Sequence, residues 1–125
     1  MSYSTSRSDL LIMRTLLPAL LLLVITTQRS SGQFADWCIA DEQVPDDVLQ
    51  EALDWACAEN RADCSKIREN QPCYLPNTVR DHASYAFNDY YQKFKHKRAT
   101  CYFNSAAFIT AIDPSHDSCK FEYLR

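Results

Sequence analysis

Glycine is almost absent from this sequence. The 125 residues contain one glycine, Gly32, alongside five prolines and six cysteines. Glycine adopts positive backbone φ angles at the lowest energetic cost, and asparagine and aspartate are the next most tolerant residues. Turns that need a positive φ must therefore use those residues, and the candidates are Asn60, Asn70, Asn104 and Asp117.

Long apolar runs are also scarce. The one clear run, residues 16–25, has about ten residues, whereas a membrane-spanning helix needs roughly twenty. Basic residues precede it and the small residues 30–32 follow it, which is the pattern of a secretory signal peptide. We expect a signal peptide over residues 1–32 and one secreted domain over residues 33–125, without a membrane span. The polar end, SCKFEYLR, also predicts no glycosylphosphatidylinositol anchor.

Positive charge is in deficit in the expected domain. Residues 33–125 contain ten Lys and Arg against fifteen Asp and Glu, a net charge of −5. An acidic domain without a basic stripe is poorly suited to phosphate backbones, so we expect no nucleic-acid partner. The sequence has no C-x-x-C pair and its three histidines are scattered, so neither a metal site nor a cofactor is expected.

The cysteines indicate a disulfide framework. An even number of cysteines in a small secreted domain predicts three disulfides, although their spacing leaves the pairing open. Paired cysteines provide no nucleophile, Ser115 and His116 lack the glycines of a catalytic elbow, and so small a domain has little room for two carboxylates across a cleft. We therefore expect no catalytic residue and no enzyme. The six cysteines are Cys38, Cys57, Cys64, Cys73, Cys101 and Cys119.

Apolar periodicity predicts two helices. The first spans about Asp46 to Ala58, where Asp47 and Gln50 can form a capping box and Asp46 is the other candidate cap. The second begins after Asn77 or Thr78 and ends near residues 93–96. Residues 100–112 carry β-branched and aromatic side chains around Asn104 and Ser105 and predict a hairpin, to which residues 119–123 could add a strand. The expected fold is α+β: a small disulfide-stapled domain with two packed helices and a short antiparallel sheet.

Aromatic side chains are concentrated in the second helix, where ASYAFNDYYQKF contains five of the fifteen rings in the chain. At about 100° per residue, Phe87, Tyr90 and Phe94 share the apolar stripe and Tyr91 lies at its edge. Tyr85 lies on the opposite side, at roughly 200° from Ala83. Its neighbours on that side are carboxylates and amides: Asp81, Asn88, Asp89 and Gln92.

A ring among such side chains suits a sugar. Sugars offer apolar C–H faces to an aromatic platform and hydroxyls to planar polar groups. Tyr85 and its four neighbours are therefore the candidate binding residues, and Tyr91 and Tyr74 are weaker additions. The alternative is that the N-terminal loop or the hairpin covers this side and makes Tyr85 part of a second core. Both tryptophans, Trp37 and Trp55, are expected in the core.

Several segments together resemble a known family. WCIA, LQEALDWAC, DCSKI, CYLPNTVRDHASYAFNDYYQK and DPSHDSCKF, spread over residues 37–121, closely resemble the plant X8 domain, also called carbohydrate-binding module family 43. Six cysteines in register with these segments make the resemblance specific. It implies the cysteine pairs Cys38–Cys101, Cys57–Cys64 and Cys73–Cys119.

The resemblance also implies a function. Members of this family bind β-1,3-glucan, the callose of plant cell walls, without catalysis, so we expect a secreted, stand-alone, monomeric protein of the cell wall that binds this polysaccharide. The family usually has glycines near the third to sixth cysteines, and this sequence lacks them. A secreted protein-interaction or signalling module on the same scaffold, or an accessory partner of a separate glucanase, are the alternatives.

Overall fold

The computed structural model describes residues 34–125, so the signal peptide expected over residues 1–32 lies outside the described part of the chain. The elements confirm the α+β class. They are β1 (Trp37–Ala40), α2 (Asp46–Ala56), the 3-10 helix η1 (Cys64–Ile67), α3 (Val79–Phe94), the 3-10 helix η2 (Lys95–Lys97) and β2 (Ala107–Thr110). Within residues 34–125 no helix combines the length and apolar character that crossing a bilayer requires.

The sheet joins strands from opposite ends of the domain. β1 pairs antiparallel with β2, from Trp37 opposite Thr110 to Ala40 opposite Ala107. The predicted hairpin within residues 100–112 is therefore wrong, because the partner of β2 comes from the N-terminal side of the chain. Residues 119–123 add no strand and contribute only an isolated bridge between His116 and Cys119.

The two helices begin in different ways. The Thr78 side chain accepts a hydrogen bond from the Asp81 N–H at 3.1 Å, and its hydroxyl donates to the Asp81 carboxylate, so Thr78 caps α3 as expected. The Asp47 cap predicted for α2 is wrong. Pro45 takes the capping position in an extended conformation, and no side chain caps this helix. The Asp47 carboxylate accepts instead from the adjacent Val48 N–H.

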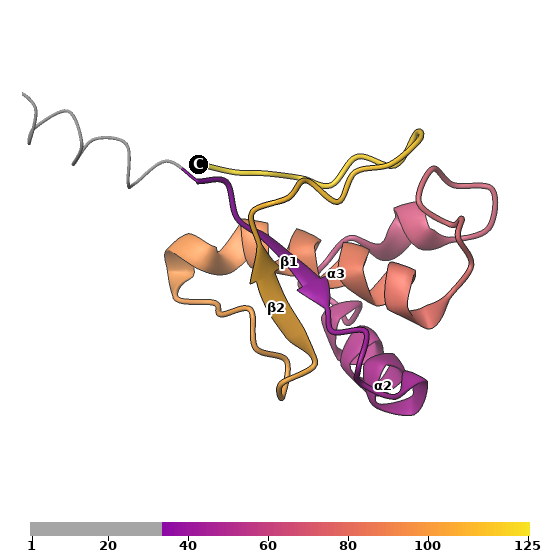
Figure 1. Cartoon of the computed structure of the whole chain (residues 1–125), viewed down its shortest axis with the longest axis horizontal. Helices are drawn as coiled ribbons and strands as arrows, with labels where there is room; N and C mark the ends of the chain where they lie inside the picture. The colour runs from indigo at the N-terminus through magenta and orange to yellow at the C-terminus, as the bar shows by residue number, and fades with distance from the viewer. Residues whose placement is uncertain (1–33) are drawn as a thin grey trace, which may run out of the picture. The chain divides into compact units, whose positions relative to one another are not determined.

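The main core lies where α3 meets both β1 and α2 (Figure 1). Ala83 and Ala86 on α3 are fully buried, and such small side chains allow the neighbouring backbones to approach closely. Phe87 lies beside them and stacks on Phe103 with ring centroids 4.1 Å apart. From α2 the core receives Leu49, Leu53 and Ala56. The face of α3 predicted to be apolar is thus its packing face.

Three disulfides hold the loops to this core. They pair Cys38 with Cys101, Cys57 with Cys64 and Cys73 with Cys119, which confirms the pairing that the family resemblance implied. The first links β1 to the segment before β2 across 63 residues of sequence. Because a disulfide that closes a long loop restricts the unfolded chain strongly, this bridge supports a sheet of only two short strands.

The shortage of glycine appears directly in the backbone. Asn60, Asn70, Asn104 and Asp117 all have positive φ, between 49° and 66°, as predicted. Three further residues with positive φ were not anticipated, namely Arg98, Phe103 and Ser105. Of these seven residues, four lie between positions 98 and 105, so the backbone strain is concentrated in the loop that leads from η2 to β2.

Candidate functional site

The ring that the sequence placed on an open face is buried. Tyr85 is 3% exposed and belongs to a second core cluster with Trp37, Phe121 and the disulfide Cys73–Cys119. The expectation of an exposed platform is therefore wrong, and the alternative of a second core is the one observed. Burial, followed by the nearby Asp89 carboxylate, raises the pKa of Tyr85 to about 12.

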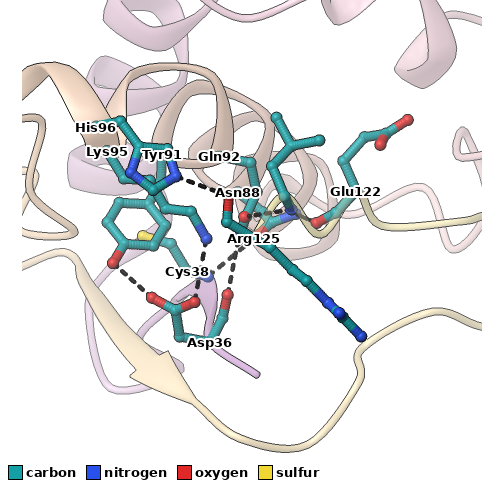
Figure 2. A network of polar contacts seen from close by, with 10 residues as sticks. Asp36, Cys38, Asn88, Tyr91, Gln92, Lys95, His96, Glu122 and Arg125 are labelled. Carbon is teal, nitrogen blue, oxygen red and sulfur yellow. Dashed lines mark hydrogen bonds and ion pairs between the residues drawn. The ribbon is translucent and has the colours of Figure 1, made fainter. Parts of the chain in front are cut away.

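Two of the predicted amides fasten the ends of the domain to α3. Asn88 accepts a hydrogen bond from the Cys38 N–H at 3.1 Å and donates to the Glu122 carbonyl at 2.8 Å. Gln92 donates to the Asp36 carbonyl at 2.7 Å and accepts from the Leu124 N–H at 2.9 Å. Figure 2 shows these groups bridging the start of β1 and the C-terminal segment. Both side chains are 1% exposed, and their hydrogen bonds are made within the protein.

Tyr91 extends the same network. Its hydroxyl donates to Asp36 at 2.6 Å, while the Lys95 ammonium lies 3.2 Å from the other oxygen of that carboxylate (Figure 2). Burial and the hydrogen bond to Asp36 raise the pKa of Tyr91 to about 12. Its polar atom is thus engaged inside the protein rather than presented to a ligand.

The remaining predicted residues also have local partners. Asp89 is 4% exposed and accepts from the Asp63 N–H and from the Lys93 ammonium, each at 2.7 Å. Asp81 belongs to the cap of α3 described above. Tyr74 is half-buried beside His82, whose ring nitrogen lies 2.7 Å from the Tyr74 carbonyl oxygen. The structure brings Tyr85, Asp89 and Gln92 together at a hollow of about 260 Å³, next to the C-terminal segment.

A larger groove opens on the other side of α3, where one wall is α2 and the other is the loop after η2. Its volume is about 550 Å³. Trp55 on α2 is 45% exposed in it, and Tyr102 on the loop is 59% exposed. The expectation that Trp55 belongs to the core is therefore wrong. The groove is lined mainly by Val48, Glu51, Ala52, Trp55, Tyr90, Arg98, Tyr102, Phe103 and Asn104.

Three neighbours fix the Trp55 ring. Tyr90 and Phe103 meet it edge-on, with centroids 5.2 Å and 5.9 Å away. The Arg61 guanidinium lies 3.9 Å from the ring centroid and donates to the Trp55 carbonyl at 2.7 Å. The disulfide Cys57–Cys64 closes the short loop that carries Arg61, so the cation is held against the ring. Edge-on aromatic contacts and a cation over the ring face are both favourable arrangements.

The loop wall of the groove is held under strain. Arg98, Phe103 and Asn104 all line the groove and have φ angles of 72°, 48° and 54°. Each left-handed residue other than glycine costs on the order of 1 kcal/mol, so the surrounding contacts must compensate. The disulfide at Cys101 and the stacking of Phe103 on Phe87 provide those contacts. Strain of this kind is common at binding sites.

The signal for the groove was present in the sequence. At about 100° per residue, Trp55 lies roughly 110° from the centre of the apolar stripe of α2, with Val48 and Glu51 on the same flank. A tryptophan so far from the packing face needs either another covering element or solvent. The residues that form the opposite wall, however, follow no helical period, and sequence periodicity could not associate them with α2.

The groove has the chemistry of a binding site for a polar ligand with apolar faces. It combines a fixed ring with a carboxylate at Glu51, an amide at Asn104 and a guanidinium at Arg98. Over residues 34–125 no group of three or more His, Cys, Asp or Glu side chains is arranged to hold a metal ion. Fold and groove together define a class: small disulfide-stapled modules with an open groove lined by aromatic side chains.

Comparison with known proteins gives the family. The chain belongs to the X8 domain family, whose sequence model matches residues 36–108. It is 49% identical over 85 residues to glucan endo-1,3-beta-glucosidase 4 of Arabidopsis thaliana, an alignment covering 68% of this chain and 17% of that protein. It is 40% identical over 106 residues to plasmodesmata callose-binding protein 5 of Arabidopsis thaliana, covering 82% of this chain and 59% of that one.

A third relative is shorter. The major pollen allergen Ole e 10 of Olea europaea is 41% identical over 85 residues, covering 68% of this chain and 69% of its own length. The chain thus spans 17% of the length of the glucosidase and 59% of the callose-binding protein. No solved structure matches the chain.

Proposed function

We propose that this domain is a non-catalytic module that binds β-1,3-glucan through the groove around Trp55. The observation that carries the proposal is a half-exposed tryptophan, fixed on three sides, in an open groove of an X8 domain. Relatives named for hydrolysing 1,3-β-glucan and for binding callose, a β-1,3-glucan, support the choice of ligand.

The groove offers what a glucan chain needs. The C–H faces of a pyranose ring can lie on the exposed parts of Trp55 and Tyr102, where they displace water from apolar surface. The hydroxyls around the sugar can bond to Glu51, Asn104 and Arg98, because these groups supply both acceptors and donors. Rings fixed before binding lose little side-chain entropy, which favours affinity.

Binding without hydrolysis fits the charges in the groove. Most glycosidases hold two carboxyl groups on opposite sides of the scissile bond, about 5–10 Å apart. Among the described residues that line the groove, Glu51 is the one carboxylate. An acid without a second carboxylate can hydrogen-bond a hydroxyl but lacks the partner that this mechanism needs.

An extracellular location accompanies this function. Three disulfides in one small domain are typical of proteins that fold in an oxidising compartment and persist outside the cell. We propose that the protein is secreted to the plant cell wall, where an insoluble β-1,3-glucan is within reach of a small soluble domain.

The test is retention on insoluble β-1,3-glucan, with cellulose as the control polysaccharide. The oxidised domain of residues 33–125 should be retained on the β-1,3-glucan and should pass through cellulose. Absence of retention by a folded domain would overturn the proposal and favour a protein-interaction module on the X8 scaffold.

A matched pair of variants locates the site. Trp55→Ala should reduce retention strongly, since truncating a central aromatic anchor commonly costs about 2 kcal/mol or more of binding free energy, roughly 30-fold in Kd. Phe108→Ala is the control, because Phe108 is also 45% exposed but lies on β2 outside the groove. Equal losses in both variants would place the glucan elsewhere on the surface.

A further inference from the structure

The groove continues past Trp55 into a second hollow of about 320 Å³. The two share Trp55, Tyr90, Arg98 and Ala99, so they form one continuous surface. Of the two hollows, the second alone is lined by Asn60, Arg61, Phe94 and Lys97, and we call it the basic hollow after its three cations, Arg61, Lys97 and Arg98. A ligand lying on Trp55 therefore has a neutral to acidic environment at its Glu51 end and a cationic one at the other.

The three cations carry uncompensated charge. Within residues 34–125 the ion pairs join Arg80 to Glu42, Lys93 to Asp89 and Lys95 to Asp36, and none includes a cation of the basic hollow. The expected domain as a whole has a net charge of −5. A positive concavity on an acidic protein focuses the field on one small region and attracts an anion of matching size.

Arg61 is arranged to receive a planar anion. One of its amino groups already donates to the Trp55 carbonyl, and the guanidinium lies over the Trp55 ring. A guanidinium has five N–H donors in a rigid fork, so donors remain for a carboxylate after one is used. Because the ring and the closed Cys57–Cys64 loop already hold this side chain, binding need not freeze it.

We propose that the basic hollow is a subsite for a carboxylated sugar unit, a uronate, next to the neutral sugar that lies on Trp55. The proposal rests on the proposed function, since it assigns a second sugar unit to an extension of the same groove. The aromatic face beside the cations suits a pyranose ring, and the fork of Arg61 with the ammonium of Lys97 suits the carboxylate of that ring. Three cations on an acidic domain suit a single carboxylate better than a nucleic-acid backbone.

The test compares three soluble ligands by calorimetric titration of the oxidised domain: a neutral β-1,3-gluco-oligosaccharide, an oligogalacturonate and the methyl ester of that oligogalacturonate. The domain should bind the oligogalacturonate, and binding should weaken as salt rises because the attraction is between charges. The ester should bind at least roughly tenfold more weakly, because it lacks the charge that strengthens these hydrogen bonds. The neutral oligosaccharide should bind with little dependence on salt.

Two double variants with the same change in net charge assign the effect to the hollow. Lys97→Gln with Arg98→Gln should weaken oligogalacturonate binding at least tenfold, whereas Arg68→Gln with Lys120→Gln should leave it within about twofold of the unmodified domain. All four side chains are exposed, so both variants should fold. A carboxylated β-1,3-glucan oligosaccharide serves as a fourth ligand. Comparing its affinity with that of the oligogalacturonate distinguishes a carboxylate carried by a glucan chain from one carried by a separate polysaccharide.

The outcomes separate the two proposals. Equal loss in both double variants would assign the binding to general charge and overturn the subsite. No binding of either acidic sugar by a domain that binds the neutral oligosaccharide would overturn the subsite and leave the glucan proposal intact. Failure of the neutral oligosaccharide together with failure on insoluble glucan would overturn the proposed function itself.

Discussion

Tyr85 and Trp55 are both large aromatic side chains on amphipathic helices, yet Tyr85 is 3% exposed and Trp55 is 45% exposed. Tyr85 is packed in the second core cluster, together with Phe121 from the C-terminal segment and Trp37 from β1. Trp55 meets aromatic rings edge-on and a guanidinium over its face, and it is exposed in the groove. The difference does not come from the helix positions. It comes from segments far away in sequence that pass over one side of the helix pair.

The polar face of a helix can therefore be buried inside a domain rather than exposed to solvent. Tyr85 is surrounded on its helix by side chains that usually face solvent, but Asn88 and Gln92 are buried because they satisfy the backbone of the chain ends. Buried polar groups are stable when all their hydrogen bonds are made. Amides on a helix can thus indicate the docking of an irregular segment as readily as a binding surface.

The largest expected effect is a loss of stability when the second core around Tyr85 is truncated. Tyr85→Ala should lower the free energy of unfolding by about 3–5 kcal/mol, because it leaves a cavity in the second core. Trp55→Ala should cost about 1 kcal/mol, since much of the ring is already in solvent. Denaturant unfolding of both oxidised variants measures the contrast. A stable Tyr85→Ala variant that has lost glucan retention would contradict the assignment of Tyr85 to the core and of Trp55 to the binding groove.

The next effect concerns the loop beneath Arg61. Replacing Cys57 and Cys64 together by alanine should lower the free energy of unfolding by about 2–3 kcal/mol, as expected for a short closed loop. Because Arg61 would no longer be held on Trp55, oligogalacturonate affinity should also fall, while retention on neutral glucan falls less. Thermal unfolding and titration of the same variant separate the two effects. Unchanged oligogalacturonate affinity would show that the loop keeps its form without the bridge.

A smaller loss is expected in the polar network. Asn88→Ala should destabilise the domain by about 1–3 kcal/mol, because it leaves the Cys38 N–H and the Glu122 carbonyl without their buried partner. Hydrogen exchange should then accelerate at Cys38 and in the C-terminal segment. Asn77→Ala, at an exposed position without a positive φ angle, serves as the comparison and should not accelerate exchange at Cys38. Equal protection in the two variants would contradict the role assigned to Asn88.

The smallest effect is a dependence on alkaline pH. The pKa of Tyr85 is raised to about 12 in the folded domain and returns to about 10 on unfolding. The unfolded state therefore loses this proton first, so the stability contribution is complete below pH 10 and declines as pH rises towards 12. Absorbance of tyrosinate should show two late-titrating groups, Tyr85 and Tyr91, and Tyr85→Phe should remove one of them while the Tyr91 group remains. Titration of all tyrosines together near pH 10 would argue against burial of this hydroxyl.

The sequence was most informative where local rules decide the structure. Apolar periodicity placed α2 and α3, Thr78 was one of the two candidate caps of α3, and four left-handed turn residues were found from the lack of glycine. The strand partner of β2 was not predictable in this way, because β1 lies about seventy residues earlier and pairing at that distance depends on the whole core. The same limit applied to Tyr85: its angle on the helix was predicted, but helical periodicity could not decide between an exposed ring and one covered by a distant segment.

The groove around Trp55 could be predicted from the sequence only in part. Trp55 could have been recognised as lying off the packing face, but the loop opposite it carries a run of left-handed residues, including Phe103, that no propensity predicts. A phenylalanine reaches this conformation because its ring stacks on Phe87, so tertiary packing overrides the local preference. Groove walls built from such loops follow from the finished fold rather than from short sequence patterns.

The attachment of the C-terminal segment to α3 limits how far a recombinant fragment of this domain can be shortened. The family match ends at residue 108, but the disulfide partner of Cys73 and one backbone hydrogen-bond partner each of Asn88 and Gln92 lie between Cys119 and Leu124. A recombinant fragment trimmed to the matched region would leave Cys73 as a free thiol and would uncover the Tyr85 ring. It would also remove one hydrogen-bond partner from each of the buried amides of Asn88 and Gln92. Any minimal version of this X8 domain for crystallisation or display should therefore extend through the final residues of the chain.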